Sequence, residues 1–406
     1  MAAIRAGQLR QDVTLLEKNP ILGKKILLSG KGRCNLTNTC DLSAFFRRFS
    51  RNGQFLRDAF NKFFNQDLMR FFTERGLKLK VERQGRVFPQ TDKSGSIVEV
   101  LRKELLRNKV NILYNSCVKS IEAPAKAVKG IFLEDGRFFP GERIILATGG
   151  VSYAFTGSTG EGLIMAQRLG HKIAQLRPGL VPLRVAQGFP RALSGLTLKN
   201  IRLEFSDGEK HILSEIGELL FTDFGISGPL VLSLSGKIVD WLLEEKEVFV
   251  EIDLKPALSR EQVSRRLHRD FQGSYKKGIN NVLKNSLPKR LISVFLELAK
   301  INPDKKVNQV TREELSTLIS LFKGLRLDIQ GALPIEEAMV SRGGVSLKEI
   351  NPRTMESRLI KGLYFAGEMI DLDADTGGFN LQAAFSTGYL AGESASLSPS
   401  PGLITH

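Results

Sequence analysis

The stretch "GLYFAGEMIDLDADTGGFNLQAAFSTGYLAG", residues 362–392, combines a short apolar run, a polar turn and a helical pattern. The apolar run ends at Ala366, a glycine follows, and the acidic residues Glu368 and Asp371 come soon after it. Two adjacent glycines then lead into the helical pattern. Because a helix N-terminus carries about half a unit of positive charge, this order suits a phosphate group. The stretch therefore predicts the nucleotide-binding edge of an α/β sheet, although tight packing of a strand, a turn and a helix would also explain it.

A second turn of small residues, "ATGG" at 147–150, follows an apolar strand predicted at 143–148. Small residues at a strand end let the backbone approach a bulky planar ligand or a pyrophosphate closely. Taken alone, the motif is equally well explained by a tight strand-to-loop turn. A further strand is predicted at 12–17, and amphipathic helices are predicted at 94–109 and 158–171. These elements together indicate an α/β fold.

The α/β pattern is interrupted in the middle of the chain. Residues 190–257 are predicted as a β-meander with turns at "SDGE" and "TDFGISGP", and residues 258–325 are predicted to be mainly helical. The strand pattern of the first segment then returns. This arrangement predicts one discontinuous nucleotide-binding domain, 1–189 and 336–406, with a second domain inserted at 190–335.

The bulk composition excludes several classes of protein. Among the 406 residues, 42% are hydrophobic and 25% are charged, which is usual for a globular chain of about two to three domains. No apolar run approaches the roughly 18 residues of a membrane span. Three cysteines, Cys34, Cys40 and Cys117, form no CxxC or Cys/His cluster, so they indicate neither a disulfide framework nor a zinc site. We therefore expect a protein of a reducing cytoplasm, without a membrane anchor and without a metal.

The formal net charge of +16 favours a polyanionic partner, of which nucleic acid is the commonest in a cytoplasm. Two segments, 45–64 and 258–278, interleave arginine and lysine with aromatic residues, a composition suited to phosphate contact and base stacking. Each segment taken by itself is better explained as an amphipathic helix that turns its phenylalanines to a core. Charge alone is also compatible with ordinary solvated basic faces.

The segment "SGKGRCNLTN", residues 29–38, is rich in glycine, asparagine and cations, and it is therefore predicted to be a ligand-binding loop outside the core. Its cysteine, Cys34, lies beside Arg33 and close to Lys31. Neighbouring cations lower the pKa of a thiol and make it available for chemistry. The alternative is a small buried thiol, which is what most cysteines are.

The order of these motifs resembles the BaiN/RdsA-type flavoprotein family, and the resemblance covers nearly the whole chain. The motifs that carry it are, in chain order, VTLLEKN (13–19), GKKILLSGKGRCNLTN (23–38), RVFPQTDKS (86–94), IILATGGVSY (144–153), TGSTGEGLIMAQRLGH (156–171), GISGPLVLSLS (225–235), SRGGVSLKEINPRTMESRLIKGLYFAGEMID (341–371) and TGGFNLQAAFSTGYLAG (376–392). The resemblance implies a Rossmann-like FAD-binding domain of the glutathione-reductase type, formed by 1–189 and 336–406. It also implies that the inserted domain has a β-barrel-like part at 190–257 and a mainly helical part at 258–335.

The resemblance further implies which residues contact FAD. Glu17 would accept hydrogen bonds from the adenosine ribose hydroxyls, and Val118 would read the adenine edge through its backbone. The middle of FAD would be lined by Ala147, Thr148 and Gly149. The ribityl chain and phosphate would be contacted by Gly367, Glu368 and Asp371, and the isoalloxazine by Gly378, Asn380 and Leu381. The reactive face of the flavin would be bordered by Ser29, Gly32, Arg33, Cys34 and Asn35.

In the family, a first strand and a GxGxxG-type turn precede the helix that contains Met1 here. A missing central strand would leave ladder groups of its neighbours unpaired, each at a cost of about 1–3 kcal/mol. Native stability is only about 5–15 kcal/mol, so such a chain should hardly fold. We therefore expect that the first strand and the Gly-rich turn are missing because of a misassigned start codon or a truncated gene. The order of motifs after this point shows no other gap.

Family members are flavin reductases driven by a reduced nicotinamide, so the resemblance implies an oxidoreductase that acts on C=C bonds. Some members have been linked to dihydrouridine formation in large-subunit ribosomal RNA, and others to reduction of conjugated bile-acid enones. Hydride would pass from NADPH or NADH through FAD to the electron-poor carbon. The second carbon then needs a proton from a general acid. Cys34 is the first candidate for this role and Tyr153 the second.

Three functions remain open on the sequence. A reductase of ribosomal RNA is favoured by the net charge and needs a basic surface at the flavin, for which the candidates are Arg47, Arg48, Arg51, Arg57 and Arg86. A reductase of a small enone needs an apolar pocket instead. A flavin-free, truncated binding protein is the third possibility. Because no second nucleotide fingerprint occurs, the nicotinamide is expected to bind only transiently.

Overall fold

The computed structural model describes residues 1–10, 12–274 and 276–397, and it divides the chain into two compact units. Unit 1 consists of Met1–Gly179 and the segment that begins at Ile335, and unit 2 consists of Leu180–Pro334. Unit 2 begins before the expected position 190, because residues 183–185 pair with strands of unit 2. The final residues of the domain expected at 336–406 lie outside the described residues.

Unit 1 contains most of the predicted α/β elements. Its helices are α1 (Ala2–Leu9), α2 (Lys24–Leu28), α3 (Leu42–Phe46), α4 (Arg57–Lys62), α5 (Asn65–Thr73), α6 (Ser94–Arg107), α7 (Glu161–Arg168) and α14 (Phe379–Leu397). Its strands are β1 (Thr14–Leu16), β2 (Thr37–Asn38), β3 (Leu79–Val81), β4 (Arg86–Pro89), β5 (Asn111–Leu113), β6 (Val118–Glu122), β7 (Gly130–Leu133), β8 (Phe138–Pro140), β9 (Ile144–Leu146), β10 (Ile173–Gly179), β18 (Val340–Val345) and β19 (Leu363–Phe365).

Two parallel strand pairs position the functional part of unit 1. Strand β1 pairs with β5, so that Leu16 lies opposite Leu113. Strand β9 pairs with β19, so that Leu146 lies opposite Phe365. Leu146 and Phe365 belong to one apolar cluster, and their burial explains why these short strands are so hydrophobic. The strands predicted at 12–17 and 143–148 are thus confirmed, whereas the strand expected before Met1 stays a prediction.

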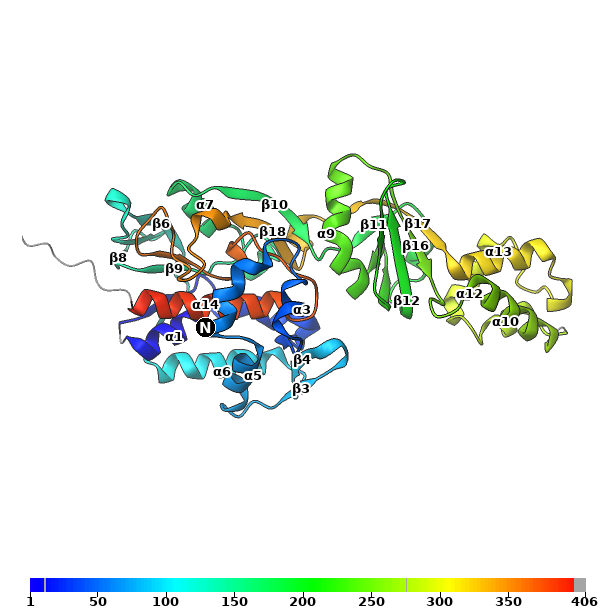
Figure 1. The fold of residues 1–406 in the computed structure, drawn as a ribbon, viewed down its shortest axis with the longest axis horizontal. Helices are drawn as coiled ribbons and strands as arrows, with labels where there is room; N and C mark the ends of the chain where they lie inside the picture. Colours follow the sequence, from blue (N-terminus) through cyan, green and yellow to red (C-terminus); the bar gives the residue numbers. More distant parts are fainter. Residues whose placement is uncertain (11, 275, 398–406) are drawn as a thin grey trace, which may run out of the picture. The chain divides into compact units, whose positions relative to one another are not determined.

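Helix α14 packs closely on α1 through two glycines, and the two helices lie side by side in Figure 1. A Cβ atom at Gly392 would lie 2.3 Å from the carbonyl oxygen of Ala2, and one at Gly388 would lie 3.4 Å from the amide nitrogen of Ala2. Only a residue without a side chain allows helix backbones to approach this closely. The "STGYLAGES" pattern therefore encodes a helix contact.

The first aromatic and basic segment, 45–64, turns its phenylalanines inward. Phe45 and Phe60 are buried, and Phe45 packs edge-on against Phe379 at a ring-centroid distance of 4.7 Å. A backbone bridge between Phe49 and Ala374 joins the same segment to the turn before α14. These rings form a core, so the amphipathic-helix explanation holds for this segment, and its buried rings are not available to stack on bases. The exposed arginines between them remain available to a ligand.

Unit 2 has its own sheet and its own core. Its strands are β11 (Leu183–Val185), β12 (Thr197–Ser206), β13 (His211–Leu213), β14 (Gly217–Thr222), β15 (Gly225–Ser227), β16 (Val248–Asp253) and β17 (Leu325–Ala332). Its helices are α8 (Phe189–Ala192), α9 (Pro229–Leu243), α10 (Arg260–Gln272), α11 (Ile279–Leu283), α12 (Lys289–Leu298) and α13 (Arg312–Lys323).

The sheet of unit 2 has the order β13-β12-β14-β15-β11-β17-β16, and β16 also pairs with β12. The first half of the long strand β12 pairs with β14, where Leu198 lies opposite Leu219. Its second half pairs with β16, where Phe205 lies opposite Val250. The order of pairing thus leads from β12 through β14, β15, β11, β17 and β16 back to β12. Because a barrel is also defined by strand tilt and shear, the expected barrel stays a prediction.

One segment of the predicted meander is a helix. The run "GPLVLSLSG" begins helix α9, which has Pro229 at its first turn and continues to Leu243. Proline suits this position because its missing N–H would have no partner there, and its φ angle already matches a helix. The β-branched and leucine residues that suggested a strand are instead buried against the sheet, Val231 completely. Within the described part of the chain, no helix is long and apolar enough to cross a membrane.

The helices predicted at 258–325 are confirmed. Ser259 and Thr311 cap α10 and α13, each accepting a hydrogen bond from the backbone three residues later. Helices α10, α12 and α13 gather at one end of the sheet (Figure 1), and Phe295 of α12 meets Phe322 of α13 edge-on at 5.3 Å. The final part of the region expected to be helical, up to residue 335, instead contains strand β17.

Replacing Phe322 by alanine should lower the free energy of unfolding by about 3–5 kcal/mol, because its ring is 1% exposed and fills the space between two helices. Phe224→Ala is the matched control, since that ring is 39% exposed and should cost less than about 1 kcal/mol. Urea denaturation measures both changes. Equal losses in the two variants would contradict the assigned core.

Candidate functional site

The predicted site residues of unit 1 follow the carboxyl ends of its parallel strands. Glu17 follows β1, Ala147 and Thr148 follow β9, and Gly367 follows β19 after one intervening residue. Ala147 and Thr148 are exposed although they directly follow the buried Leu146. In open α/β sheets, ligands bind outside the carboxyl ends of the strands. The strand ends therefore define the candidate site.

The end of β1 is attached to the segment that follows β9. One carboxylate oxygen of Glu17 accepts hydrogen bonds from the backbone N–H of Asn19 at 2.9 Å and from its side chain at 2.8 Å. The Asn19 side chain also donates to the carbonyl of Thr156 at 3.0 Å. Next to it, the Lys18 ammonium and Glu161 form an ion pair of 2.6 Å. These contacts bring the predicted ribose-binding carboxylate close to the loop after β9.

A backbone hydrogen bond brings the start of β6, where Val118 lies, close to Glu17. The N–H of Ser116 donates to the carbonyl of Glu17 at 3.0 Å, and Val118 begins β6 two residues later. Val118 lies opposite Leu133 in the β6–β7 pair and packs on the apolar core. The structure therefore brings the two predicted adenosine contacts into one neighbourhood.

The carboxylate of Glu368 is the centre of a polar network that joins four segments of unit 1. It forms an ion pair of 2.6 Å with Lys25 of α2. It also accepts hydrogen bonds from the Ser152 hydroxyl at 2.8 Å and from the backbone N–H of Ser341 at 2.7 Å. Lys25 closes the ring by donating to the Ser152 hydroxyl at 2.7 Å. Ser152 and Ser341 are fully buried, so this network holds the loop after β9, the strand β18 and the turn after β19 together.

The sequence predicted Glu368 but missed its three partners, Lys25, Ser152 and Ser341. Lys25 lies in the short helix α2, just before the predicted loop 29–38. The hydroxyl of Ser341 accepts hydrogen bonds from the N–H groups of Val151 and Ser152, at 2.8 and 3.0 Å. The only available signal was that all three lie in or next to the motifs quoted above.

The predicted loop 29–38 meets the start of α14. The Thr37 hydroxyl donates to Gln382 at 2.6 Å, and the Asn38 side chain donates to the carbonyl of Gly377 at 3.2 Å. The Asn35 amide, oriented by its partners, accepts from the N–H of Gly378 at 3.1 Å. The two groups of residues expected around the flavin ring are thus brought together.

Gly378 has to be a glycine at this contact. Its φ angle is +95°, and a Cβ atom would lie 2.4 Å from the carbonyl oxygen of Thr37. The loop is also less exposed than expected, since Thr37 and Asn38 are buried. Their polar groups do not oppose burial because partners on α14 and in the preceding turn satisfy them.

Helix α14 connects this contact to the Glu368 network. Gln382, at its first turn, accepts from Thr37. Five residues later, the Thr387 hydroxyl accepts a hydrogen bond of 3.0 Å from the backbone N–H of Gly367. One helix therefore contacts both parts of the candidate site.

The environment of Cys34 differs from the one expected. Its side chain is fully buried in an apolar cluster, and its φ angle is +60°. Burial raises the pKa of the Cys34 thiol to about 11, although a hydrogen bond with Ser29 opposes this rise. The expectation of a lowered pKa is therefore wrong.

The cation beside Cys34 has other partners. Arg33 pairs with Glu82 and, at 2.7 Å, with Asp92, and its guanidinium lies 4.2 Å from the centre of the Phe88 ring. These two carboxylates compensate the charge of Arg33, so that charge does little to lower the pKa of the Cys34 thiol. Two other residues of this group, Ser29 and Gly32, are half-buried. Ser29 donates to the carbonyl of Ile26, and Gly32 has a φ of +83° with no atom within 4 Å of where a Cβ would lie.

Tyr153, the second candidate acid, directly follows Ser152 of the Glu368 network. Its N–H donates to the carbonyl of Glu336 at 2.9 Å, and its ring meets Phe155 edge-on. The side chain is half-buried, and burial raises the pKa of its phenol. Tyr153, unlike Cys34, is therefore only partly withdrawn from solvent.

The remaining predicted flavin contacts have structural partners. The Asn380 side chain accepts from the N–H of Ala374 at 2.9 Å and donates to its carbonyl at 2.8 Å, so it closes the turn before α14. Leu381 packs on the apolar cluster that contains Cys34. Asp371 is half-buried, and its backbone N–H donates to the carbonyl of Val345 at 3.2 Å.

Four of the five predicted arginines lie on the segment that packs against the start of α14. Arg47, Arg51 and Arg57 are exposed. Arg48 lies 3.6 Å from the carboxylate of Asp375, and its guanidinium is 5.9 Å from the centre of the Phe379 ring. The fifth, Arg86, lies opposite Asn38 in the β2–β4 pair. The structure thus places Arg48 and Arg86 beside the contact between the loop 29–38 and the start of α14, and it leaves Arg47, Arg51 and Arg57 exposed on the neighbouring segment.

The residues present fit FAD. Gly149 and Gly367 follow two adjacent parallel strands and have φ angles of +75° and +74°, which form the tight turns needed for close backbone approach. The exposed Ala147 and Thr148 leave room beside them, and the Glu17 carboxylate is oriented by Asn19. Small residues and an oriented carboxylate at the strand ends are the features of a dinucleotide site.

The fold and these strand ends define an α/β, Rossmann-type dinucleotide-binding protein. The model of the family described as HI0933-like protein Rossmann domain matches residues 1–394. The chain belongs to this HI0933-like, or BaiN/RdsA-type, family of FAD-dependent oxidoreductases. The expected family and the expected enzyme class, an oxidoreductase, are therefore confirmed.

Three curated relatives cover nearly the whole chain. It is 34% identical over 402 residues to the 3-dehydro-bile acid delta(4,6)-reductase of Clostridium scindens, a match that spans 98% of this chain and 97% of the relative. It is 31% identical to the ribosomal RNA dihydrouridine synthase of Haemophilus influenzae, with 95% and 93% covered, and 31% identical to that of Escherichia coli, with 95% and 92% covered.

Solved structures show the same fold at low sequence identity. The 3-ketosteroid delta1-dehydrogenase of Sterolibacterium denitrificans is 12% identical, with a TM-score of 0.51 over 97% of this chain and 96% of that one. The FrdA chain of Escherichia coli quinol fumarate reductase is 16% identical, with a TM-score of 0.50 over 97% of this chain and 67% of that one. Both likenesses concern the fold alone.

Glu368→Gln should lower the free energy of unfolding by about 1–3 kcal/mol, because a neutral amide removes the charge partner of Lys25 inside a largely buried network. Glu337→Gln, at an exposed position, is the matched control and should change stability by less than about 0.5 kcal/mol. Urea denaturation at neutral pH measures both. An unchanged midpoint for Glu368→Gln would contradict the role given to the network.

Cys34 should resist alkylation in the folded protein. With a pKa of about 11, only about 0.1% of the thiol is ionised at pH 8, and burial also blocks access. Iodoacetamide at pH 8, followed by peptide mass spectrometry, should label the partly exposed Cys40 well before Cys34. Labelling of Cys34 should rise as the pH rises toward its pKa, and both cysteines should react alike in urea. Equal native rates at pH 8 would refute the burial of this thiol.

Proposed function

We propose that the chain uses FAD and NADPH or NADH to reduce an activated C=C bond, and that its substrate is uridine in large-subunit ribosomal RNA. The proposal at the level of C=C reduction is supported by relatives whose names describe a delta(4,6)-reductase and a dihydrouridine synthase. The choice of RNA is carried by one observation: the segment that packs against the start of α14 exposes Arg47, Arg51 and Arg57 and holds Arg48 beside Asp375.

In this proposal, FAD lies along the carboxyl ends of β1, β9 and β19. The Glu17 carboxylate accepts hydrogen bonds from the ribose of the adenosine half, and the backbone of Val118 contacts the base. Ala147, Thr148 and Gly149 line the middle of the cofactor. When bound, FAD supplies the ability to take a hydride from the nicotinamide and to give it to the substrate carbon. The nicotinamide binds only transiently.

The turn after β19, the loop 29–38 and the start of α14 would hold the flavin end of the cofactor. Gly367, Glu368 and Asp371 lie beside the ribityl chain and phosphate, and Lys25 adds a cation next to them. The flavin ring is contacted by Gly378, Asn380 and Leu381. Its reactive face would be bordered by Ser29, Gly32, Arg33 and Asn35, with the buried Cys34 behind them.

Reduction of a C=C bond adds one hydride to one carbon and one proton to the other, so the chain must supply a proton donor. The geometry favours Tyr153 over Cys34 for this role. The Tyr153 phenol is half-buried next to the Glu368 network and stays protonated at neutral pH because burial raises its pKa. Cys34 also stays protonated, but its thiol has no exposed surface from which to reach a substrate.

The arginines provide the contact to RNA in this proposal. Arg47, Arg51 and Arg57 are exposed, Arg48 lies beside the start of α14, and Arg86 lies opposite Asn38 of the loop. Guanidinium groups bind phosphate oxygens through paired hydrogen bonds. Because the neighbouring phenylalanines are buried, binding at this surface should depend on phosphate contacts more than on base stacking.

The second candidate substrate is a small conjugated enone. It is favoured by the bile-acid reductase, which at 34% is slightly more similar to this chain than the two synthases are at 31%. An enone has no phosphates, so the arginines would contribute little to its binding. A protein that holds no FAD would be consistent with neither substrate.

The test is dihydrouridine in ribosomal RNA. In a strain that lacks the gene, mass spectrometry should find one 23S uridine without the two added hydrogens, and a plasmid copy should restore them. Tyr153→Phe should keep the yellow flavin absorbance but lower product formation about 100-fold or more. Cys34→Ala is the matched comparison and should retain most of the activity.

Three results would count against the proposal. Unchanged ribosomal RNA in the deletion strain, together with turnover of a conjugated steroid enone, would favour the second substrate. A purified protein that is colourless and cannot be reconstituted with FAD would remove the cofactor. Full activity in Tyr153→Phe with loss in Cys34→Ala would reverse the assignment of the proton donor.

A further inference from the structure

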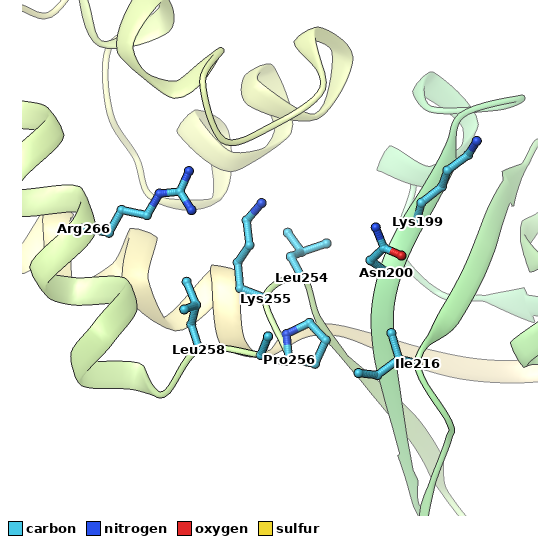
Figure 2. A pocket seen from close by; sticks show the side chains of 9 residues that line it. Lys199, Asn200, Ile216, Leu254, Lys255, Pro256, Leu258 and Arg266 are labelled. Atoms are coloured by element: carbon cyan, nitrogen blue, oxygen red, sulfur yellow. The ribbon is translucent and has the colours of Figure 1, made fainter.

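Unit 2 contains a cavity of about 400 Å³ between β12, the loop after β16 and helix α10 (Figure 2). Its lining residues are Lys199, Asn200, Ile216, Leu254, Lys255, Pro256, Ala257, Leu258 and Arg266. Three of them are cations, most of the others are apolar, and none is acidic. The volume suits a ligand of nucleotide size, since small-molecule sites occupy about 300–1,000 Å³.

Lys255 and Arg266 make this cavity strongly positive. In Figure 2 both side chains extend toward the same space, from the loop after β16 and from α10. Lys255 is half-buried, and both burial and the charge of Arg266 lower the pKa of its ammonium group. Two neighbouring cations are held together here against their repulsion, which an anion between them would relieve.

The nearby carboxylates compensate the charge of this pair only in part. Asp253, which precedes this loop, accepts from the Lys323 ammonium at 2.6 Å and from the backbone N–H of Lys255. Asp270 on α10 lies 4.0 Å from Arg266, the limit for an ion pair. On the other wall, Glu218 of β14 lies opposite Lys199 of β12. The excess positive charge is therefore located at Lys255 and Arg266.

The cavity is also rigid. The Lys323 ammonium donates to the carbonyls of Lys255 at 3.1 Å and Leu258 at 2.7 Å, so it ties both ends of the loop to α13. Pro256 restricts the backbone between them. Directly after the loop, the Ser259 cap fixes the start of α10 and with it the position of Arg266. Such a preformed site binds a ligand without the entropic cost of ordering a loop.

The apolar part of the lining complements the charged part. Ile216, which is 42% exposed, and the side chains of Leu254, Pro256 and Leu258 form a surface for a flat, weakly polar group. A site that joins cations to an apolar wall suits a phosphate that carries a ring. Proteins that bind single-stranded nucleic acid combine a cationic groove with aromatic side chains. Here the wall beside the cations is aliphatic, so a base or sugar would pack on it without aromatic stacking.

We propose that this cavity binds one nucleotide of a single-stranded RNA, with its phosphate between Lys255 and Arg266 and its base or sugar against the apolar wall. Phosphate binding follows from the cavity itself, whereas the identification of the carrier as RNA rests on the proposed function. In this arrangement unit 2 anchors the RNA, while chemistry takes place in unit 1. The arginines at the start of α14 and this cavity are then two separate contacts for one polyanion.

The test measures RNA binding without turnover. The full chain is titrated against a short, fluorescein-labelled, uridine-rich single-stranded RNA, and anisotropy gives the affinity at several salt concentrations. The double variant Lys255→Gln/Arg266→Gln should bind at least about tenfold more weakly, and the slope of log affinity against log salt should fall by about 0.7, the value for one phosphate contact on a single strand. The control, Arg265→Gln/Lys289→Gln, removes the same charge from exposed positions in the same unit and should change affinity less than about twofold.

Melting temperature and flavin content should match the parent protein in both variants, so that a loss of binding cannot be ascribed to unfolding. An equal loss in the two variants would mean that only net charge matters, and it would overturn the proposal. Unlabelled uridine monophosphate and inorganic phosphate serve as competitors. If uridine monophosphate or phosphate binds at the cavity while Lys255→Gln/Arg266→Gln keeps full affinity for RNA, the cavity is a site for a small free phosphate compound. That result would overturn the assignment of RNA as the ligand.

The result is also separable from the proposed function. Cavity-dependent RNA binding by a chain that forms no dihydrouridine would support this inference and contradict the reaction. Unchanged RNA binding in the pocket variant of a chain that does form dihydrouridine would overturn this inference alone.

Discussion

The interaction on which unit 1 depends is the convergence of polar groups on the Glu368 carboxylate. A carboxylate withdrawn from water is costly unless cations and hydrogen-bond donors surround it. Here Lys25, Ser152 and the backbone of Ser341 provide them, each from a different segment of the chain. The parallel pairing of β9 and β19 brings the loop after β9 and the turn after β19 together, and the satisfied Glu368 carboxylate holds both to β18 and α2.

Much of this arrangement could be predicted from local patterns. Strands such as Thr14–Leu16 and Leu363–Phe365 can be recognised as apolar runs that end at small or acidic residues. Such runs are typical because parallel strands are buried on both faces and therefore consist mainly of apolar residues. Gly378 was recognisable because helix starts near a ligand favour glycine. The family followed from the order of such motifs. The barrel and the individual site roles stay predictions, because neither can be derived from pairing or from sequence order.

What could not be predicted depends on distant partners. Nothing in the local sequence distinguishes Lys25 or Ser341, because the role of each comes from its hydrogen bond to the Glu368 carboxylate in another segment. Cys34 seemed activated by the neighbouring Arg33, but the fold turns that guanidinium to Glu82 and Asp92 and places the thiol in a core. The start of α9 was mistaken for a strand because apolar content without a clear period does not distinguish a buried helix from a buried strand.

Helix α14 contacts the loop through Gln382 and the Glu368 network through Thr387. Five residues of an α-helix span about 7.5 Å, a separation that thermal motion hardly changes. One continuous helix therefore carries both contacts of the site, so the two halves are not expected to move against each other about a hinge. A shift of the loop 29–38 relative to the turn after β19 would therefore require α14 itself to bend or to move as a whole. A change in one of these contacts should consequently be felt at the other.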